Sequence, residues 1–127
     1  MLIVKTYVND SPVHGRGLFA GEDILPGAVI WREGFELLYS SEHFEQLSDA
    51  QKHFISTWGW KDKHDGFHHL SLDYDRFINH SDDANTFVGR SGLTIAKRLI
   101  RRGEEIFCNY AEFEAEFRFN EYHTAAR

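Results

Sequence analysis

The chain has 127 residues, 42% of them hydrophobic and 27% charged, which excludes a disordered segment and allows one compact domain. The formal net charge of −6 argues against a protein that binds nucleic acid by neutralising phosphates, and favours a basic partner. A single cysteine, Cys108, excludes an internal disulfide, and no apolar run approaches the roughly 20 residues that span a bilayer.

The first ten residues lack the charged start, apolar stretch and small-residue cleavage site of a secretory signal. We therefore expect a protein that is not secreted by a signal peptide and lies in the cytoplasm, or in the nucleus if the source is a eukaryote. Charge is uneven along the chain, because four basic residues cluster at 97–102 and residues 103–127 hold six Glu and two Arg. Two ordinary solvated faces account for this distribution.

The first half of the chain predicts short strands followed by helix. Residues 1–8 and 27–39 are rich in β-branched and aromatic residues and are interrupted by turn-forming residues at 10–12 and 26–27. From 41 to 58 the apolar residues fall near three-and-four spacing, and Ser48 and Gln51 are arranged as a capping box. This pattern predicts one interrupted helix or two short ones.

The second half predicts further brief strands around 70–72, 77–78, 87–88, 92–96 and 106–110, after a charged loop at 61–66. The stretch 112–122 has aromatic residues at helical intervals and predicts a short amphipathic C-terminal helix or an ordered tail. Many short strands, few helices and frequent turns together predict a mostly-β domain built from several small sheets.

Three segments carry the candidate chemistry. In the first, Gly15 and Gly17 flank Arg16, and this spacing lets the backbone approach a ligand closely, although for this segment alone a plain hairpin turn is the favoured interpretation. The second, residues 76–85, reads Arg-Phe-Ile-Asn-His-Ser-Asp-Asp-Ala-Asn. Its polar side chains directly follow an apolar pair, so they need hydrogen-bond partners, which are either one another or a bound polar ligand. The alternative to a ligand site is an Asx-rich turn at the end of a strand. The third, residues 103–110, ends in Tyr110.

Taken together and in this order, the three segments resemble the SET domain, the family of protein-lysine methyltransferases that use S-adenosylmethionine. The stretch from Gly15 to Ala20, followed by 23–24 and 27–30, is similar to the family's opening motif. Residues 76–81 with Asn85 are similar to its most specific signature, and 103–110 to its closing motif. The resemblance covers most of the chain and implies a single SET domain over residues 1–127, with a variable insert at about 41–72 and a tail at about 111–127.

The resemblance implies a β-clip, SET-like fold of small curved sheets with a pseudoknot, in which the closing segment passes through a loop bounded by the signature strand. It implies that the backbone at Gly15, Arg16 and Gly17 contacts S-adenosylmethionine, with Asn79 binding the amino-acid end by its side chain and His80 by its backbone. Tyr110 aligns with the catalytic tyrosine.

The sequence also departs from the family pattern. Asp82 and Ala84 stand where the family often has Cys and Pro, and no cysteine cluster follows Tyr110 to bind zinc. The adenine therefore needs another cover, for which Phe113, Phe117 and Phe119 are candidates. Cys108 stands where the family has an aromatic residue that influences how many methyl groups are added, which leaves the product number open. Expected substrate contacts are Trp58, Tyr74 and Cys108, with Trp60 as a further candidate, although packing of the insert accounts equally well for the three aromatic residues.

Methyl transfer to lysine needs alignment, exclusion of water and a hydroxyl near the reacting amine, but no metal or protein nucleophile. Tyr110 can supply the hydroxyl, and an acidic rim suits a basic lysine-containing protein or peptide.

A metal site at His64, His68 and His69, or at Asp73, Asp75, Asp82 and Asp83, is a weaker interpretation; solvated loop histidines and Asp-rich turns are expected instead. Two other functions stay open: an inactive SET-like module that binds only a basic peptide or the cofactor, and a methyltransferase for a non-lysine amine.

Overall fold

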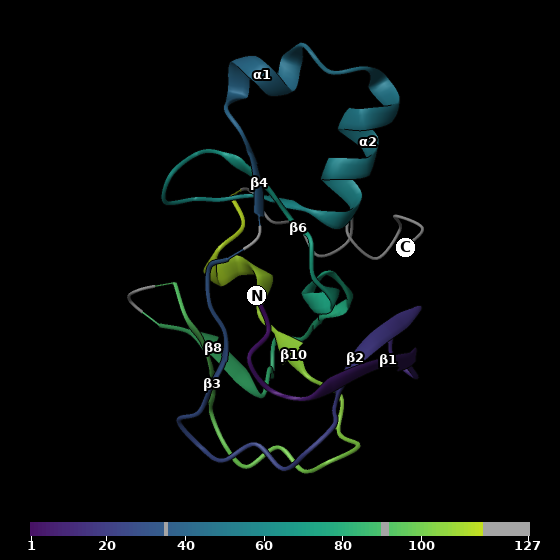
Figure 1. Ribbon diagram of the computed structural model, residues 1–127, viewed down its shortest axis with the longest axis vertical. Coiled ribbons are helices and arrows are strands. Elements are labelled where there is room, and N and C mark those ends of the chain that lie inside the picture. Colours follow the sequence, from purple (N-terminus) through teal and green to yellow (C-terminus); the bar gives the residue numbers. More distant parts are fainter. Residues whose placement is uncertain (35, 90–91, 116–127) are drawn as a thin grey trace.

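The computed structural model describes residues 1–34, 36–89 and 92–115 and shows a mostly-β architecture of four small sheets (Figure 1). Strands β1 (Thr6–Asp10) and β2 (Arg16–Ala20) form an antiparallel hairpin in which Thr6 pairs with Ala20 and Asp10 with Arg16. A three-stranded sheet has the order β3-β9-β8, formed by Val29–Trp31, Thr94–Ala96 and Thr86–Val88. No helix in the described ranges is long and apolar enough to cross a membrane.

Of the remaining two sheets, one precedes the signature segment in the chain and the other contains part of it. One has the order β4-β6-β5, formed by Glu36–Tyr39, His68–Ser71 and Trp60–Lys61. The other is a parallel pair of β7 (Asn79–His80) and β10 (Phe107–Cys108), with Asn79 opposite Phe107. A parallel pair needs a long connection, and here the whole 81–106 segment supplies it.

The predicted helical region forms two helices, α1 (Ser41–Glu45) and α2 (Asp49–Trp58), which lie together at one end of the molecule (Figure 1). The Ser48 hydroxyl accepts a hydrogen bond from the Gln51 amide at 3.2 Å, and the Gln51 side chain accepts one from the Ser48 amide at 2.9 Å. The capping box is therefore confirmed, and it starts α2 at the next residue.

The core lies where β2, β3 and β9 meet the segment that leads into β10. Its fully buried members are aliphatic: Leu18, Ile30, Ile100 and Ile106. Ala20 N donates to Glu104 O at 2.9 Å, and Ile106 N donates to Leu18 O at 2.8 Å, so the closing segment runs along β2 before it pairs with β7. These contacts fix the first, second and third motifs against one another.

One local prediction is wrong. Phe77 lies in a 3₁₀ turn, η1 (Tyr74–Phe77), and not in a strand, because the Asp73 carboxylate accepts from the Tyr74 amide and caps the turn. Of the C-terminal stretch 112–122, the structure describes 112–115. After the 3₁₀ turn η2 (Tyr110–Glu112), Lys63 N donates to Phe113 O at 2.9 Å and Ala115 N donates to Lys61 O at 2.7 Å, so these residues form an ordered segment rather than the start of a helix. The rest of the predicted C-terminal helix lies outside the described residues.

Candidate active site

Asn79 ties the glycine motif to the signature segment. Its side chain is buried, and Nδ2 donates to the carbonyls of His14 at 2.8 Å and Arg16 at 3.1 Å, and to Glu105 Oε2 at 3.0 Å. The Ser11 hydroxyl donates to the same carboxylate at 2.7 Å. The structure thus brings the segment around Gly15 and Gly17 directly against Asn79.

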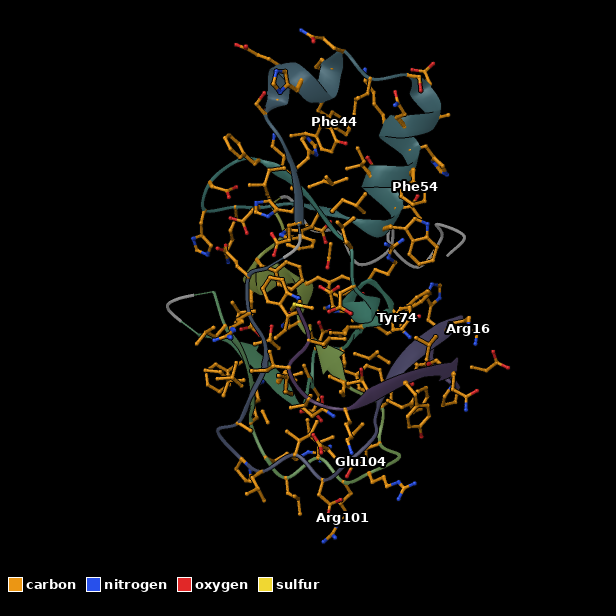
Figure 2. All side chains as sticks on the ribbon, in the orientation of Figure 1. Arg16, Phe44, Phe54, Tyr74, Arg101 and Glu104 are labelled. Atoms are coloured by element: carbon orange, nitrogen blue, oxygen red, sulfur yellow. The ribbon has the colours of Figure 1, made fainter. Side chains whose placement is uncertain are left out.

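Gly15 and Gly17 are required there for different reasons. Gly15 has a φ of +48°, in the left-handed region that L side chains rarely adopt. At Gly17 a Cβ atom would lie 2.6 Å from Glu105 Oε2, so a larger residue there would displace that carboxylate from its position beside Asn79. Figure 2 shows Arg16 at the outer end of the hairpin, with its side chain exposed.

His80 joins the signature segment to the closing motif. Its Nδ1 accepts a hydrogen bond from the Tyr110 amide at 3.1 Å, which leaves the proton on Nε2, and Nε2 donates to Asp82 Oδ1 at 2.9 Å. Asp82, one of the departures from the family pattern, therefore accepts from the protonated nitrogen of this tautomer. The ring of His80 also lies 5.3 Å from that of Tyr110.

The Tyr110 phenol is held at the base of the signature segment. The side chain is buried, and its hydroxyl donates to the Ile78 carbonyl, one residue before Asn79. The hydroxyl is the donor in this bond, and a phenol oxygen can also accept hydrogen bonds through its lone pairs. Because Ile78 directly precedes Asn79 in the chain, this bond holds the phenol next to the start of β7, although Tyr110 and Asn79 are 31 positions apart in sequence.

A cavity of about 190 Å³ opens beside Tyr110. Its walls include aromatic rings from the insert, the closing segment and β3: Trp31, Trp58, Trp60, Tyr110 and Phe113. Five carboxyl groups also line it, from Glu33, Glu36, Asp62, Asp75 and Glu114, against one guanidinium, that of Arg76. An aromatic cavity with an excess of carboxylates suits a cationic side chain with a long apolar stem.

Cys108 lies in the wall of this cavity next to Tyr110. Burial raises the pKa of its thiol to about 12, although a hydrogen bond from the Thr86 hydroxyl at 3.6 Å opposes the rise. The thiol therefore stays protonated and serves as a small, neutral part of the wall.

Asp75 is a second perturbed group of the cavity. Burial raises the pKa of its carboxyl to about 6, and the carboxylates of Asp73 and Glu36 act in the same direction; a hydrogen bond from Ser71 and the N-terminal ammonium oppose them. Within the described ranges, no donor lies within hydrogen-bond distance of its buried Oδ1.

His69 is held between two carboxylates at the edge of the cavity. Nδ1 lies 3.0 Å from Glu36 Oε2 and Nε2 lies 2.8 Å from Asp65 Oδ2. Burial alone would lower the pKa of His69, but these two carboxylates outweigh it and raise the pKa. His69 is only 4% exposed, so the prediction of a solvated loop histidine is wrong at this position, because β6 carries it into the sheet between β4 and β5.

The predicted substrate contacts are only partly brought together. Trp58, Trp60 and Cys108 line the cavity. Tyr74, labelled in Figure 2, does not; it is 62% exposed, and its ring is tilted by 49° to that of Phe77 with centroids 6.4 Å apart. Phe113 lines the cavity and contacts Trp60 and Tyr110, with ring centroids 5.8 and 5.7 Å away. Phe117 and Phe119 lie outside the described residues.

Neither of the two metal sites considered from the sequence, the histidine group and the aspartate group, is formed by the described residues. Among the residues that could be searched, only Asp62, Asp65 and His69 bring ligand atoms within 4.8 Å of one another. Asp73 instead caps η1 and Asp82 binds His80. His69 already uses both ring nitrogens on carboxylates.

Sequence reasoning missed Glu105, Glu36 and Asp75 as parts of the site. Glu105 belongs to the closing motif, but its contact with Asn79 depends on how β2 and β7 are brought together. Glu36 and Asp75 lie 39 positions apart and meet only because β4, β6 and η1 fold against each other. No spacing of residues in the sequence could have predicted that these two carboxyl groups lie close together.

Comparison with known proteins identifies the family. The model of the SET domain matches residues 15–111. A Plasmodium falciparum protein described as a histone methyltransferase is similar in structure, with a TM-score of 0.62, 22% identity, and coverage of 84% of this chain and 93% of that chain. A search of the curated proteins finds no match.

Two structures of Polycomb Repressive Complex 2 are also similar. A humanized mutant from Chaetomium thermophilum, bound to an inhibitor, has a TM-score of 0.62 and 22% identity over 88% of this chain. The apo form of ctPRC2 with mutations in Ezh2 has a TM-score of 0.70 and 21% identity over 89%. This chain covers only 16% of each of those chains. SET domains are typically protein-lysine methyltransferases that use S-adenosylmethionine, and on the match over residues 15–111 this chain belongs to the SET domain family.

Proposed function

We propose that this protein transfers methyl groups from S-adenosylmethionine to the side-chain amine of a lysine in a basic protein or peptide. The observation that carries the proposal is the position of Tyr110. Its amide and hydroxyl are both bound by the signature segment, at His80 and Ile78, and its ring lines an aromatic, acidic cavity. That arrangement presents a fixed phenol oxygen to a cation that enters the cavity.

The residues expected to hold the cofactor converge in a way that suits it. The carbonyls of His14 and Arg16 and the carboxamide of Asn79 meet within 3.1 Å, which places polar backbone from the glycine motif beside the signature segment. The amino-acid end of S-adenosylmethionine carries an ammonium and a carboxylate, which need such acceptors and donors. When bound, this cofactor supplies a methyl group on a sulfonium. Gly15, Arg16, Gly17, Asn79 and His80 would hold it, with Phe113 and Phe117 as candidates to cover the adenine.

The chain's own part in the reaction is to bind and orient the amine. Trp58 and Cys108 contact the apolar stem of the lysine, while the phenol oxygen of Tyr110 accepts a hydrogen bond from the amine. The aromatic walls exclude water, which strengthens each polar contact inside the cavity. A lysine ammonium has a pKa of about 10.4 in water and must lose a proton before it attacks, so desolvation in this cavity favours the reactive form.

We further propose that residues 1–127 act as one SET domain, in which the insert at 41–72 shapes the substrate groove. Trp58 and Trp60, which contribute to the cavity, come from this insert. Its substrate is a basic protein, since carboxylates outnumber cationic groups in the cavity lining.

The test is the variant Tyr110→Phe, which removes one oxygen atom and keeps the ring. The protein is incubated with isotope-labelled S-adenosylmethionine and a cell lysate, and lysine methylation is read by mass spectrometry. We expect the variant to lose about 10²- to 10³-fold in methyl transfer, the usual size of the loss of one positioned electrostatic group. Cofactor affinity, measured by calorimetry, should stay within about twofold, because the phenol does not belong to the cofactor-binding set.

The control variant is Tyr39→Phe, which makes the same change in β4, away from the signature segment. Full activity of the Tyr110→Phe protein would remove the phenol from the mechanism. Cofactor binding by the unaltered protein without label on any lysine would favour a SET-like module that binds but does not catalyse; label on a different amine would favour a non-lysine substrate.

A further inference from the structure

Asp75 is a half-buried carboxyl group of the cavity that has no role in the mechanism above. It lines the same cavity as Tyr110 and Cys108. Its backbone carbonyl accepts a hydrogen bond from the Ile78 amide at 3.0 Å, and the Ile78 carbonyl in turn accepts from the Tyr110 hydroxyl. The backbone of Asp75 and the phenol are therefore both bonded to Ile78, the residue that joins η1 to β7.

The charges around Asp75 leave its anion weakly stabilised. Glu36 from β4 and Asp73 beside η1 are like charges, and only the N-terminal ammonium and the Ser71 hydroxyl of β6 favour the ionised form. The Arg76 guanidinium donates to the backbone carbonyls of Ser71 and Asp73, at 3.2 and 3.4 Å. His69 of β6 is held by Glu36 and Asp65, and the Cys108 thiol of β10 is neutral.

Oδ1 of Asp75, like Glu36 Oε1 and Trp31 Nε1 of the same cavity, is a buried polar atom without a hydrogen-bond partner among the described residues. A buried carboxylate oxygen without a donor is destabilised by the full cost of its lost hydration, so it gains from receiving a proton. This explains in geometric terms why the pKa of this carboxyl lies near 6.

We propose that Asp75 accepts the proton that the substrate ammonium must lose before methyl transfer, an inference that rests on the proposed function. One N–H bond of the ammonium breaks and its electron pair stays on nitrogen, while the proton forms an O–H bond with the carboxylate of Asp75. The charged pair becomes a neutral amine and a neutral carboxylic acid. Where both groups are removed from water, the neutral pair is favoured over two desolvated charges. The amine then attacks the methyl carbon, the carbon–sulfur bond breaks with its electrons going to sulfur, and the acid later releases its proton to water.

The first experiment compares the pH profile of kcat/KM for the unaltered protein and for Asp75→Asn, with S-adenosylmethionine and purified core histones. The unaltered protein should lose activity as the pH falls through about 6, where Asp75 becomes protonated. Asp75→Asn should lower kcat/KM by about 10²- to 10³-fold, the contribution typical of a general base, and should remove the acidic limb. Asp75→Glu should restore part of the activity together with the limb.

The control is Glu42→Gln, which removes one carboxylate from an exposed position of α1 and should leave rate and profile unchanged. Circular dichroism and thermal unfolding show whether each variant is folded. An Asp75→Asn protein that keeps the unaltered rate, or the same acidic limb at a lower rate, overturns the proposal.

A second experiment reads the proton itself and does not depend on turnover. The ¹³C carboxyl resonance of Asp75, assigned by its loss in Asp75→Asn, is followed at pH 8 as n-butylammonium chloride is added as a probe of the lysine side chain. We expect the resonance to move toward its protonated position; a resonance that does not move overturns the proposal. If the unaltered protein methylates no lysine in histones or lysate, the proposed function fails, and this titration still decides whether Asp75 takes a proton from a bound amine.

Discussion

Asn79 shows how much of the site depends on a single side chain. Its one amide nitrogen serves three acceptors from two other segments, the carbonyls of His14 and Arg16 and the carboxylate of Glu105. Two hydrogens must therefore be shared among three oxygens. Removing the amide leaves buried acceptors without a donor, which costs more than the bond itself contributed.

We expect Asn79→Ala to lower the free energy of unfolding by about 1–3 kcal/mol, the cost of leaving buried polar groups unsatisfied. It should also weaken S-adenosylmethionine binding, since the glycine motif loses its anchor. Urea denaturation and calorimetry measure the two effects. Asn9→Ala, in an exposed part of β1, is the control and should change neither; unaltered cofactor affinity in Asn79→Ala would contradict the role proposed for this residue.

At this scale the sequence identified the residues that its motifs contain, but not the partners that those residues meet. Asn79, His80 and Tyr110 were named from their motifs, and all three lie at the junction of the signature and closing segments. Asp75 was considered only as a member of an Asp-rich turn or of a candidate cation site, because burial of Oδ1 and proximity to Glu36 depend on tertiary packing.

The helix α2 is the element that the sequence predicted best. Its apolar spacing and its capping box are local, so neither depends on distant parts of the chain. The box satisfies two backbone groups that the helix itself leaves without partners. It matters beyond the helix, since α2 carries Trp58 into the cavity wall.

Ser48→Ala should lower the free energy of unfolding by about 1 kcal/mol, the usual cost of losing an N-cap side chain. Thermal or urea unfolding monitored by circular dichroism measures it. The matched control is Ser56→Ala, an exposed site within the same helix, where alanine favours the helix slightly. Equal stability of the Ser48→Ala and Ser56→Ala proteins would show that the box contributes nothing.

The short strands were harder to delimit because their existence depends on remote partners. β7 and β10 have two residues each and are strands only because they pair with one another. Phe77 looked like part of a strand from its apolar neighbour Ile78, yet the Asp73 cap and the turn that follows place it in η1. A strand of two residues is too short to show a periodic hydrophobic pattern from which it could be predicted.

For the whole molecule, two buried groups make stability depend on pH in the same direction. Both Asp75 and His69 have a pKa that is higher in the folded chain than the ordinary value. The folded state therefore binds their protons more tightly than the unfolded state does, and stability falls as the pH rises. For Asp75 the stabilisation is complete below about pH 4 and is lost as the pH rises through about 6.

Asp75→Asn should therefore raise the free energy of unfolding at pH 7.5 by about 1–3 kcal/mol, since a shift of one pKa unit corresponds to about 1.4 kcal/mol. It should also remove the decline between pH 4 and 6. Urea unfolding at several pH values measures both effects. A variant that is less stable than the unaltered protein at pH 7.5 would show that the carboxylate is satisfied in the fold. A gain in stability with a loss of turnover would mean that the fold retains an unfavourable charge for the sake of the reaction.

The pairing of β10 with β7 and of residues 104–106 with β2 has a consequence for biosynthesis. Proteins emerge from the ribosome in chain order, and domains that depend on contacts distant in sequence complete their folding late. The hairpin and the Asn79–His80 strand leave the exit tunnel well before the segment that binds them both. A nascent chain therefore has no assembled pocket until residue 110 has been translated and released from the tunnel, and until then its apolar strands are surfaces for chaperones to cover.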